Sequence, residues 1–135
     1  MDLDRSMTIA ASGMRAQATR LRIVAENLAN RDSTAETPGG EPYRRRTVTF
    51  AERLDRATDT RTVRVARIGV DRSDFERRYD PGHPAADARG YVLLPNVNSI
   101  IEMMDMQEAQ RSYSANLGVL TTSREMLMRT IESLR

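Results

Sequence analysis

The segment from Asn96 to Arg135 reads NVNSIIEMMDMQEAQRSYSANLGVLTTSREMLMRTIESLR. A large apolar residue recurs at every seventh position, at Met106, Tyr113, Leu120, Leu127 and Leu134. Because an α-helix turns once per ~3.6 residues, this spacing places the five side chains in a slowly drifting line along one side of a helix. Most of the segment is therefore predicted to form one long helix of about 55 Å, at ~1.5 Å per residue.

The apolar arc of this segment is wider than the narrow seam of a two-stranded coiled coil. Small residues lie beside the line, at Ala109, Asn116, Ser123 and Thr130. Further apolar residues flank the small ones, with Leu117 and Ile131 on one side and Val119 and Met126 on the other. Small residues allow another helix backbone to approach closely. We therefore expect more than one partner, and we assign the flanking apolar residues to contacts between subunits.

A second periodic segment runs from Ser6 to Asn30 and is predicted to form a helix of about 38 Å. Its line of large apolar residues consists of Met7, Met14, Leu21 and Leu28, beside a line of alanines. The connection between the two helices is short enough for them to lie antiparallel. We expect these four side chains to face the line of large residues in the last helix, which is Met106, Tyr113, Leu120, Leu127 and Leu134.

The opposite face of the first helix is also apolar, with Ile9, Ala16 and Ile23 about 160 to 200° away at ~100° per residue. One partner helix cannot cover both faces. The alternative is a core helix sandwiched inside its own domain, but the middle of the chain is too polar to supply that cover. We therefore favour self-assembly or packing into a larger complex, with Ile9 and Ile23 in the interface.

Three asparagines stand out on the otherwise apolar helices, at Asn27, Asn30 and Asn116. Amides in such positions can fix the register of helix packing through specific hydrogen bonds. Asn27 and Asn30 could equally terminate the first helix, and Asn116 could equally face solvent. We include all three in the expected assembly interface.

The middle of the chain predicts a loop followed by short strands. Turn-forming residues over Arg31–Pro42 predict the loop. Alternation over Arg44–Phe50 and Thr62–Val70 predicts two strands, the second with a bulge near Ala66 or Gly69. The charged stretch between these strands, residues 51–60, is expected to be a turn of helix or an exposed connection.

A turn at Tyr79–Pro84 and a third short strand at Tyr91–Leu94 complete the insert. Asn96 or Asn98 is expected to cap the last helix, after Pro95. The sequence thus predicts an α+β fold, mainly α, whose long terminal helices pair as an antiparallel coiled coil. Residues 1–30 and 96–135 form the helical part, and residues 31–95 form the loop and a small β-rich insert.

Composition narrows the classes of function. The chain has 135 residues, a net charge of +2, 4% aromatic residues, no Trp and no Cys. Nearly balanced charge gives no reason to expect nucleic acid binding, and the absence of Cys excludes disulfides and thiolate metal sites. A membrane span needs ~20 consecutive apolar residues, and the sequence has no such run. Acidic residues in Met1–Arg5 argue against a secretory signal, so we expect any export to proceed without a cleaved signal peptide.

Catalytic chemistry has no clear location in this sequence. The one candidate metal or acid/base cluster comprises Asp71, Asp74, Asp80, His83 and Asp87, and it supports the alternative of a small metal-binding or enzymatic domain. These residues span a Pro/Gly turn without a ligand spacing, so we interpret them as turn-forming or solvated. No nucleophile motif or phosphate-binding loop is present. We therefore expect no enzyme activity, no cofactor and no metal.

The arginine run Arg44–Arg46 could contact phosphate, but no interleaved aromatic residues accompany it. A solvated strand edge or a salt bridge to a neighbouring subunit is the preferred interpretation. A basic nucleic-acid binder is the rival class, and steep salt dependence of binding to DNA would identify it.

Several motifs together resemble the bacterial flagellar rod and hook proteins. Ile9–Met14 (IAASGM) and Glu26–Asn30 (ENLAN) are similar to the N-terminal signature of that family, and Ser112–Asn116 (SYSAN) to its C-terminal signature. Motifs in the middle of the chain narrow the resemblance to the proximal-rod members: TPGG at 37–40, PYRR at 42–45, YDPGHP at 79–84, GYV at 90–92 and PNVN at 95–98.

This resemblance implies a structural subunit of the rod in the flagellar basal body. The terminal helices would form the inner coiled-coil layer of a helical tube, and the insert would lie outside it. The tube would cross the periplasm and transmit motor torque for motility. Export would use the flagellar type III apparatus, and the partners would be copies of the chain, other proximal and distal rod subunits and the base-ring complex, without direct membrane insertion.

Overall fold

The computed structural model describes residues 2–135, which contain two long helices and two small antiparallel sheets. In chain order the elements are α1 (Leu3–Ala29), β1 (Arg46–Asp55), β2 (Thr60–Val70), β3 (Glu76–Tyr79), β4 (Tyr91–Leu94) and α2 (Ser99–Ser133). The predicted α+β class, with long terminal helices around a small β-rich insert, is confirmed.

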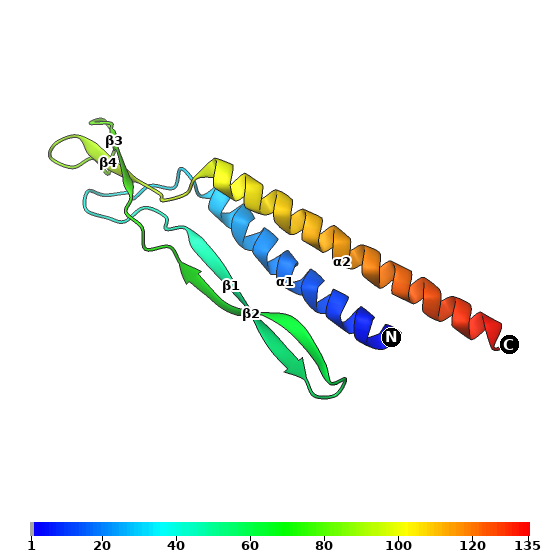
Figure 1. Cartoon of the computed structure of the whole chain (residues 1–135). Coiled ribbons are helices and arrows are strands. Elements are labelled where there is room, and N and C mark those ends of the chain that lie inside the picture. The colour runs from blue at the N-terminus through cyan, green and yellow to red at the C-terminus, as the bar shows by residue number, and fades with distance from the viewer. Residues whose placement is uncertain (1) are drawn as a thin grey trace.

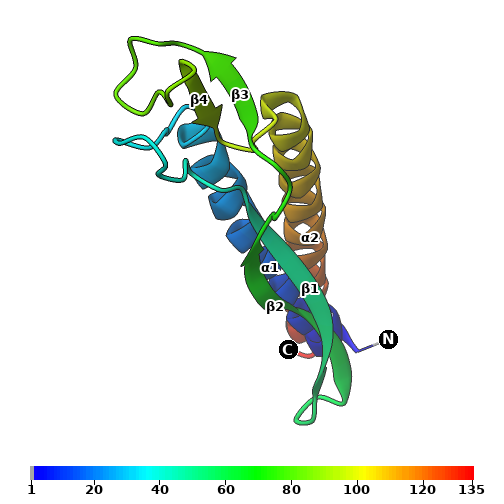
Figure 2. The ribbon, with the colours of Figure 1, turned by 90° about the vertical axis from the view of Figure 1, so that its left-hand side faces the viewer.

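The two helices lie side by side and run in opposite directions (Figure 1). The β1–β2 hairpin packs along α1 as well, chiefly through β2. Figure 2 shows the hairpin alongside α1, and the β3–β4 pair at the end of the molecule where α1 ends and α2 begins. The expectation that the insert is too polar to cover a face of α1 was wrong, because the hairpin does pack there.

Both helices begin at capping side chains. Asp2 accepts a hydrogen bond from the Asp4 N–H at 3.0 Å and caps α1. Asn98 accepts from the N–H groups of Ile100 and Ile101, at 3.0 and 3.4 Å, and caps α2. These bonds satisfy amide groups that have no partner inside the helix. Of the two caps predicted for α2, Asn98 is the one used.

The hairpin contains the predicted bulge. Thr49 pairs with Arg67 and Phe50 pairs with Val65, which leaves Ala66 as the extra residue. The predicted connection over residues 51–60 was wrong, because β1 and β2 remain paired as far as Asp55 and Thr60. Only four residues form the turn between the strands. Backbone pairing with β2 thus overrides the weak strand propensity of this charged stretch.

The β3–β4 pair forms a separate two-stranded sheet. Tyr79 pairs with Tyr91, and their rings meet edge to face with centroids 5.4 Å apart. Gly90 has a φ of +85°, and a Cβ at this position would lie 2.8 Å from the Tyr79 ring, so this turn requires glycine. β4 coincides with the predicted third strand, whereas the all-exposed β3 was not predicted.

The hydrophobic core is thin and follows α1. Its buried apolar residues are mostly small or medium in size: Ala10, Ala16, Ile23, Val24, Ala85, Val92 and Ala109. Glu102 and Asn27 are as deeply buried as Ile23 and Val92. The helices are thus joined by a polar contact as well as by apolar packing. Within residues 2–135, neither helix is long and apolar enough to cross a membrane.

Candidate assembly surface

The contact between α1 and α2 includes one very close approach. A Cβ added to Gly13 would lie 2.8 Å from both terminal atoms of the Asn116 amide. The same amide donates to the Ser112 carbonyl at 2.9 Å, which holds it in place. Seven residues further along α1, Arg20 contacts Asp105 at 2.9 Å. These contacts fix the register of the two antiparallel helices.

The same register leaves the end of α2 without a neighbouring helix. Counted along the helices from these two contacts, Leu3, the first residue of α1, lies level with residues 122–126 of α2. The last turns of α2 extend past this point, as Figure 1 shows at the two termini. Leu134 is accordingly 82% exposed. Leu127 and Leu134 were predicted to face α1. They instead continue the line of large α2 residues beyond the end of α1.

A buried asparagine links α1 to the insert and to α2. The Asn27 amide donates to the Arg46 carbonyl at 2.9 Å and to Glu102 Oε2 at 3.2 Å. Its oxygen accepts from the Tyr43 hydroxyl at 2.7 Å and from the Arg46 N–H at 2.9 Å. Two donor and two acceptor positions are thus all used. This full satisfaction explains how an amide only 1% exposed is tolerated.

Arg45 completes this polar junction, which we define as Asn27, Tyr43, Arg45 and Glu102. Its guanidinium pairs with Glu102, which is 0% exposed, and lies 3.5 Å from Asp71. Burial lowers the pKa of Arg45, but the hydrogen bond and charge of Glu102, with help from Asp71, raise the pKa overall. The Glu102 carboxylate is therefore buried only together with its counter-ion, as a charge in this position requires.

Two further pKa values respond to this environment. Burial raises the pKa of Tyr43, and the charge of Glu26 raises it further. Hydrogen bonds from the backbone and side chain of Ser73 lower the pKa of Asp71, and Arg45 adds to that effect. Asp71 is therefore held as a carboxylate beside the junction.

The arginine run forms bonds within the chain. The Arg44 guanidinium lies over the Phe75 ring, 4.3 Å from its centroid, and donates to the Asp71 carbonyl at 3.1 Å. Arg46 pairs with Glu26 at 2.6 Å. This differs from the expected solvated edge or intersubunit salt bridge, because the acidic partners lie on α1, on α2 and in the insert of the same chain.

The Asp/His turn has a structural explanation in its own hydrogen bonds. His83 Nδ1 accepts from the Ala85 N–H at 3.0 Å, and Nε2 lies 3.1 Å from the Thr34 hydroxyl. Hydrogen bonds from the backbone N–H groups of Tyr91 and Arg89 lower the pKa of Asp87. Across residues 2–135, no three His, Asp or Glu side chains are grouped so that they could hold a metal ion.

The residues predicted to pair the helices are partly covered. Seven of the nine side chains expected between the helices are half-buried: Met7, Met14, Leu21, Leu28, Met106, Tyr113 and Leu120. The most deeply buried residues of α1 toward α2 are smaller or polar, as at Gly13 and Asn27. The line of large residues therefore borders the closest contact.

The residues predicted for the assembly interface separate into two groups. Exposed apolar side chains, 45 to 52% accessible, are Ile9, Leu117, Val119, Met126 and Ile131. Ile23 is only 1% exposed, because the hairpin covers its face of α1, and Asn27 belongs to the junction. Asn30 caps the end of α1 and donates to the Glu26 carbonyl, while Asn116 packs on Gly13.

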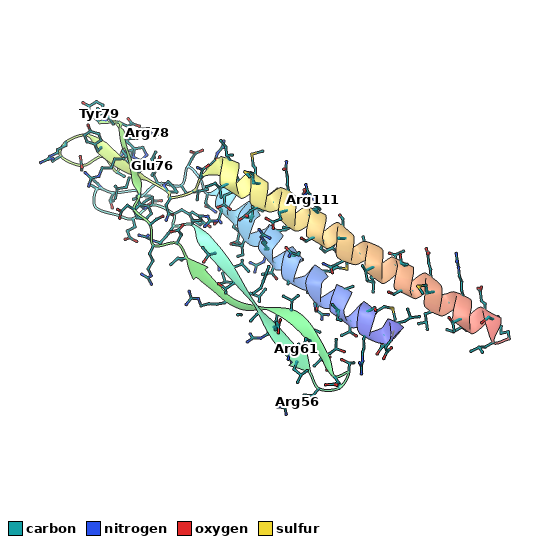
Figure 3. The ribbon with its side chains drawn as sticks, viewed as in Figure 1. Arg56, Arg61, Glu76, Arg78, Tyr79 and Arg111 are labelled. Carbon is teal, nitrogen blue, oxygen red and sulfur yellow. The ribbon has the colours of Figure 1, made fainter. Side chains whose placement is uncertain are left out.

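The start of α2 carries exposed apolar residues that the heptad pattern did not identify: Ile100, Ile101, Met103 and Met104, 51 to 71% accessible. Two neighbouring pairs of large apolar residues in one short run were the available signal. Among these apolar residues α2 also carries charged ones, such as Arg111, which points outward from the helix pair (Figure 3). Figure 3 also labels Arg56 and Arg61, at the far end of the hairpin. α2 therefore presents large apolar side chains along most of its length, a surface suited to contacts with other helices.

Two parts of the chain match known families. Residues 7–35 match the family described as "Flagella basal body rod protein", and residues 88–133 match "Flagellar basal body rod FlgEFG protein C-terminal". Proteins named "Flagellar basal-body rod protein FlgC" are similar over nearly the whole chain. The Agrobacterium fabrum protein is 53% identical, covering 98% of this chain and 96% of its own length. The Borreliella burgdorferi protein is 39% identical, covering 100% of this chain and 99% of its own length. The Escherichia coli O6:H1 protein is 42% identical, covering 91% of this chain and 91% of its own length.

Proposed function

The chain belongs to the FlgC family of flagellar basal-body rod proteins and is thus a structural subunit of the rod. From this premise we propose that it works in the proximal part of the rod. There it helps to transmit motor torque across the periplasm. The observation that carries the proposal is the row of exposed large apolar side chains on α2, because assembly with neighbouring helices would cover them.

In this proposal α1 and α2 pair as an antiparallel coiled coil that forms the inner layer of a helical tube. The close approach at Gly13 and the register set by Arg20 and Asp105 support this pairing. The hairpin and the β3–β4 pair lie on the outer side. The subunit functions as a structural element, and we assign it no catalytic role.

Torque transmission requires a stiff subunit, and the polar junction supplies stiffness at one end of the helix pair. Asn27 and Glu102 connect α1 and α2, while Tyr43 and Arg45 connect both helices to the insert. Each of these bonds has a narrow range of acceptable distances and angles. Sliding of one helix along the other would break several of them together.

The exposed flanks of α2 are the proposed contacts with neighbouring subunits. Val119 and Met126 lie on one flank, and Leu117 and Ile131 lie on the other. Two flanks allow each subunit to have a neighbour on either side. The partners in this proposal are copies of the chain, other rod proteins and the base-ring complex, reached after export by the type III apparatus.

Replacement of one exposed flank residue tests this function. We expect Val119→Asp to fold normally, because Val119 is 49% exposed, and to abolish swimming when it replaces the chromosomal copy. Thr122→Asp, an exposed position three residues further along α2, serves as the matched control and should swim. Unchanged helical circular dichroism in both variants would separate assembly from folding. Normal swimming of Val119→Asp would contradict the proposal.

A further inference from the structure

The exposed surface of α2 is rich in methionine. Seven of the chain's eight methionines lie within residues 2–135. Four of these seven are 51 to 64% exposed, and all four belong to α2: Met103, Met104, Met126 and Met128. We define these four as the outer methionines. The other three are half-buried: Met7, Met14 and Met106.

The outer methionines lie on the two flanks of α2 that carry the proposed contacts with neighbouring subunits. At ~100° per residue, Met104 and Met126 lie within about 40° of each other around the helix axis, on the flank of Val119. Met103 and Met128 lie within about 20° of each other, on the other flank. Each flank thus exposes one thioether toward each end of the helix.

Exposed thioethers are the natural target of two-electron oxidants in this chain. The side chains that usually compete for such oxidants are absent, because the chain has no Cys and no Trp. Hydrogen peroxide converts a methionine to its sulfoxide. The sulfur lone pair forms an S–O bond, the peroxide O–O bond breaks and water leaves, so the sulfur is oxidised as the peroxide is reduced. The outer methionines should react first, because the peroxide must reach the sulfur.

A sulfoxide on these flanks should act on assembly and leave folding intact. In the isolated chain the outer methionines face water, which can donate hydrogen bonds to a sulfoxide oxygen. Under an apolar neighbouring helix the same oxygen would lose these bonds, and a polar group buried without a partner is costly. For this reason oxidation of methionine disrupts interfaces that are rich in it.

We propose that the outer methionines are modification sites. Peroxide oxidises them in the unassembled chain, and the sulfoxides exclude that copy from the rod. Methionine sulfoxide reductases, which take electrons from thiols and release the oxygen as water, restore the copy for assembly. In the rod, neighbouring subunits cover and protect the same thioethers. This inference rests on the proposed function and adds a selection between intact and oxidised subunits.

Peroxide treatment of the isolated full-length protein tests the sites. Tandem mass spectrometry follows the sulfoxide fraction at each methionine with time. We expect the outer methionines to oxidise at least threefold faster than Met7, Met14 and Met106. At a dose that oxidises chiefly the outer methionines, the urea midpoint and the helical circular dichroism should be unchanged. Equal rates for the two groups, or loss of helix at this dose, would overturn the proposal.

Competition within one cell tests the effect on assembly. Differently tagged wild type and variant are expressed together, and their ratio in purified basal bodies is measured with and without a pulse of peroxide. Leucine has a volume similar to that of methionine and cannot form a sulfoxide. The variant combines four substitutions: Met103→Leu, Met104→Leu, Met126→Leu and Met128→Leu. We expect the pulse to raise the ratio of this variant to wild type at least threefold.

A matched control replaces the half-buried methionines by Met7→Leu, Met14→Leu and Met106→Leu. The pulse should leave the ratio of this control to wild type unchanged, because wild type and control share the outer methionines. No rise for the outer variant, or an equal rise for the control, would contradict the proposal.

The wild-type chain alone supplies a test that needs no variant. Cells without methionine sulfoxide reductases are treated with the peroxide pulse. The sulfoxide fraction at the outer methionines should be at least tenfold lower in chain from basal bodies than in unassembled chain from the same lysate. Equal fractions, with the chain present in basal bodies, would overturn this inference alone. Absence of the chain from basal bodies would overturn the proposed function.

Discussion

Two glycines in the helices should respond in opposite ways to the same substitution. Gly13 lies in α1 against Asn116, whereas an added Cβ at Gly118 in α2 has nothing within 4 Å. Alanine is favoured over glycine in a helix interior by about 1 kcal/mol. At Gly118 this gain should appear in full. We therefore expect Gly118→Ala to raise the free energy of unfolding by about 1 kcal/mol.

At Gly13 the same gain is opposed by a clash. The new methyl carbon would lie 2.8 Å from the Asn116 amide, which must move and give up its bond to the Ser112 carbonyl. Overpacking of this kind costs about 1 to 3 kcal/mol. After the gain in helix propensity is subtracted, the free energy of unfolding of Gly13→Ala should be about 1 kcal/mol lower than that of the wild type. The two alanine variants should then differ by about 2 kcal/mol.

Urea unfolding followed by circular dichroism at 222 nm measures both values on the isolated protein. A double-mutant cycle with Asn116→Ala identifies the cause, because removal of the amide should restore the gain from Gly13→Ala. Equal stabilisation by both glycine substitutions would refute the close approach of the helices at Gly13. A loss at Gly13 that Asn116→Ala does not relieve would show that another contact causes it.

Two other predictions concern the polar junction. Asn27→Ala should lower the free energy of unfolding by about 3 kcal/mol, because it leaves Tyr43 and Arg46 groups without partners. The control Asn30→Ala removes one capping residue and should lower the free energy of unfolding by about 1 kcal/mol. Equal losses for the two variants in urea unfolding would argue against the junction. The pKa of Asp71 is lower in the folded chain than its usual value of 3.8, so its stabilising effect is complete above that pH and is lost as the pH falls through the folded pKa. Unfolding midpoints measured below pH 4 should therefore depend less on pH in Asp71→Asn than in the wild type, and an unchanged pH dependence would contradict this assignment.

Local signals in the sequence predicted most of the helical architecture. The seven-residue lines located both helices. Asn96 or Asn98 after Pro95 marked the start of α2, because a capping side chain has a direct local role, and Asn98 is the cap. The broken alternation of the second strand predicted a bulge near Ala66 or Gly69, and the structure has it at Ala66. These features depend on residues that are close together in the chain.

Other features depend on pairing between distant residues. β1 continues through charged residues because β2 supplies its hydrogen bonds, and β3 forms opposite β4 although its residues are all exposed. Packing of the hairpin on α1 likewise buries Ile23. From composition alone, the middle of the chain had been expected to be too polar to cover this face of α1. Long-range pairing of this kind leaves little periodicity in either partner.

The polar junction was the largest gap in the sequence-based prediction. Glu102 is an acid near the start of a helix, where a carboxylate is also favoured by the helix dipole, so nothing local marks it as buried. Arg45 stands in a basic run that is typical of a solvated edge. Only the fold brings these residues together with Asn27, for which a register-fixing hydrogen bond was one of two open interpretations.

The most direct test of the proposed function is the protein composition of the purified flagellar rod. Basal bodies are isolated from cells that carry tagged wild type, Val119→Asp or Thr122→Asp, and the tag is quantified after removal of the hook and filament. We predict that wild type and Thr122→Asp remain with the rod in equal amounts and that Val119→Asp is absent. Retention of Val119→Asp at the wild-type level would contradict assembly through the exposed apolar surface of α2.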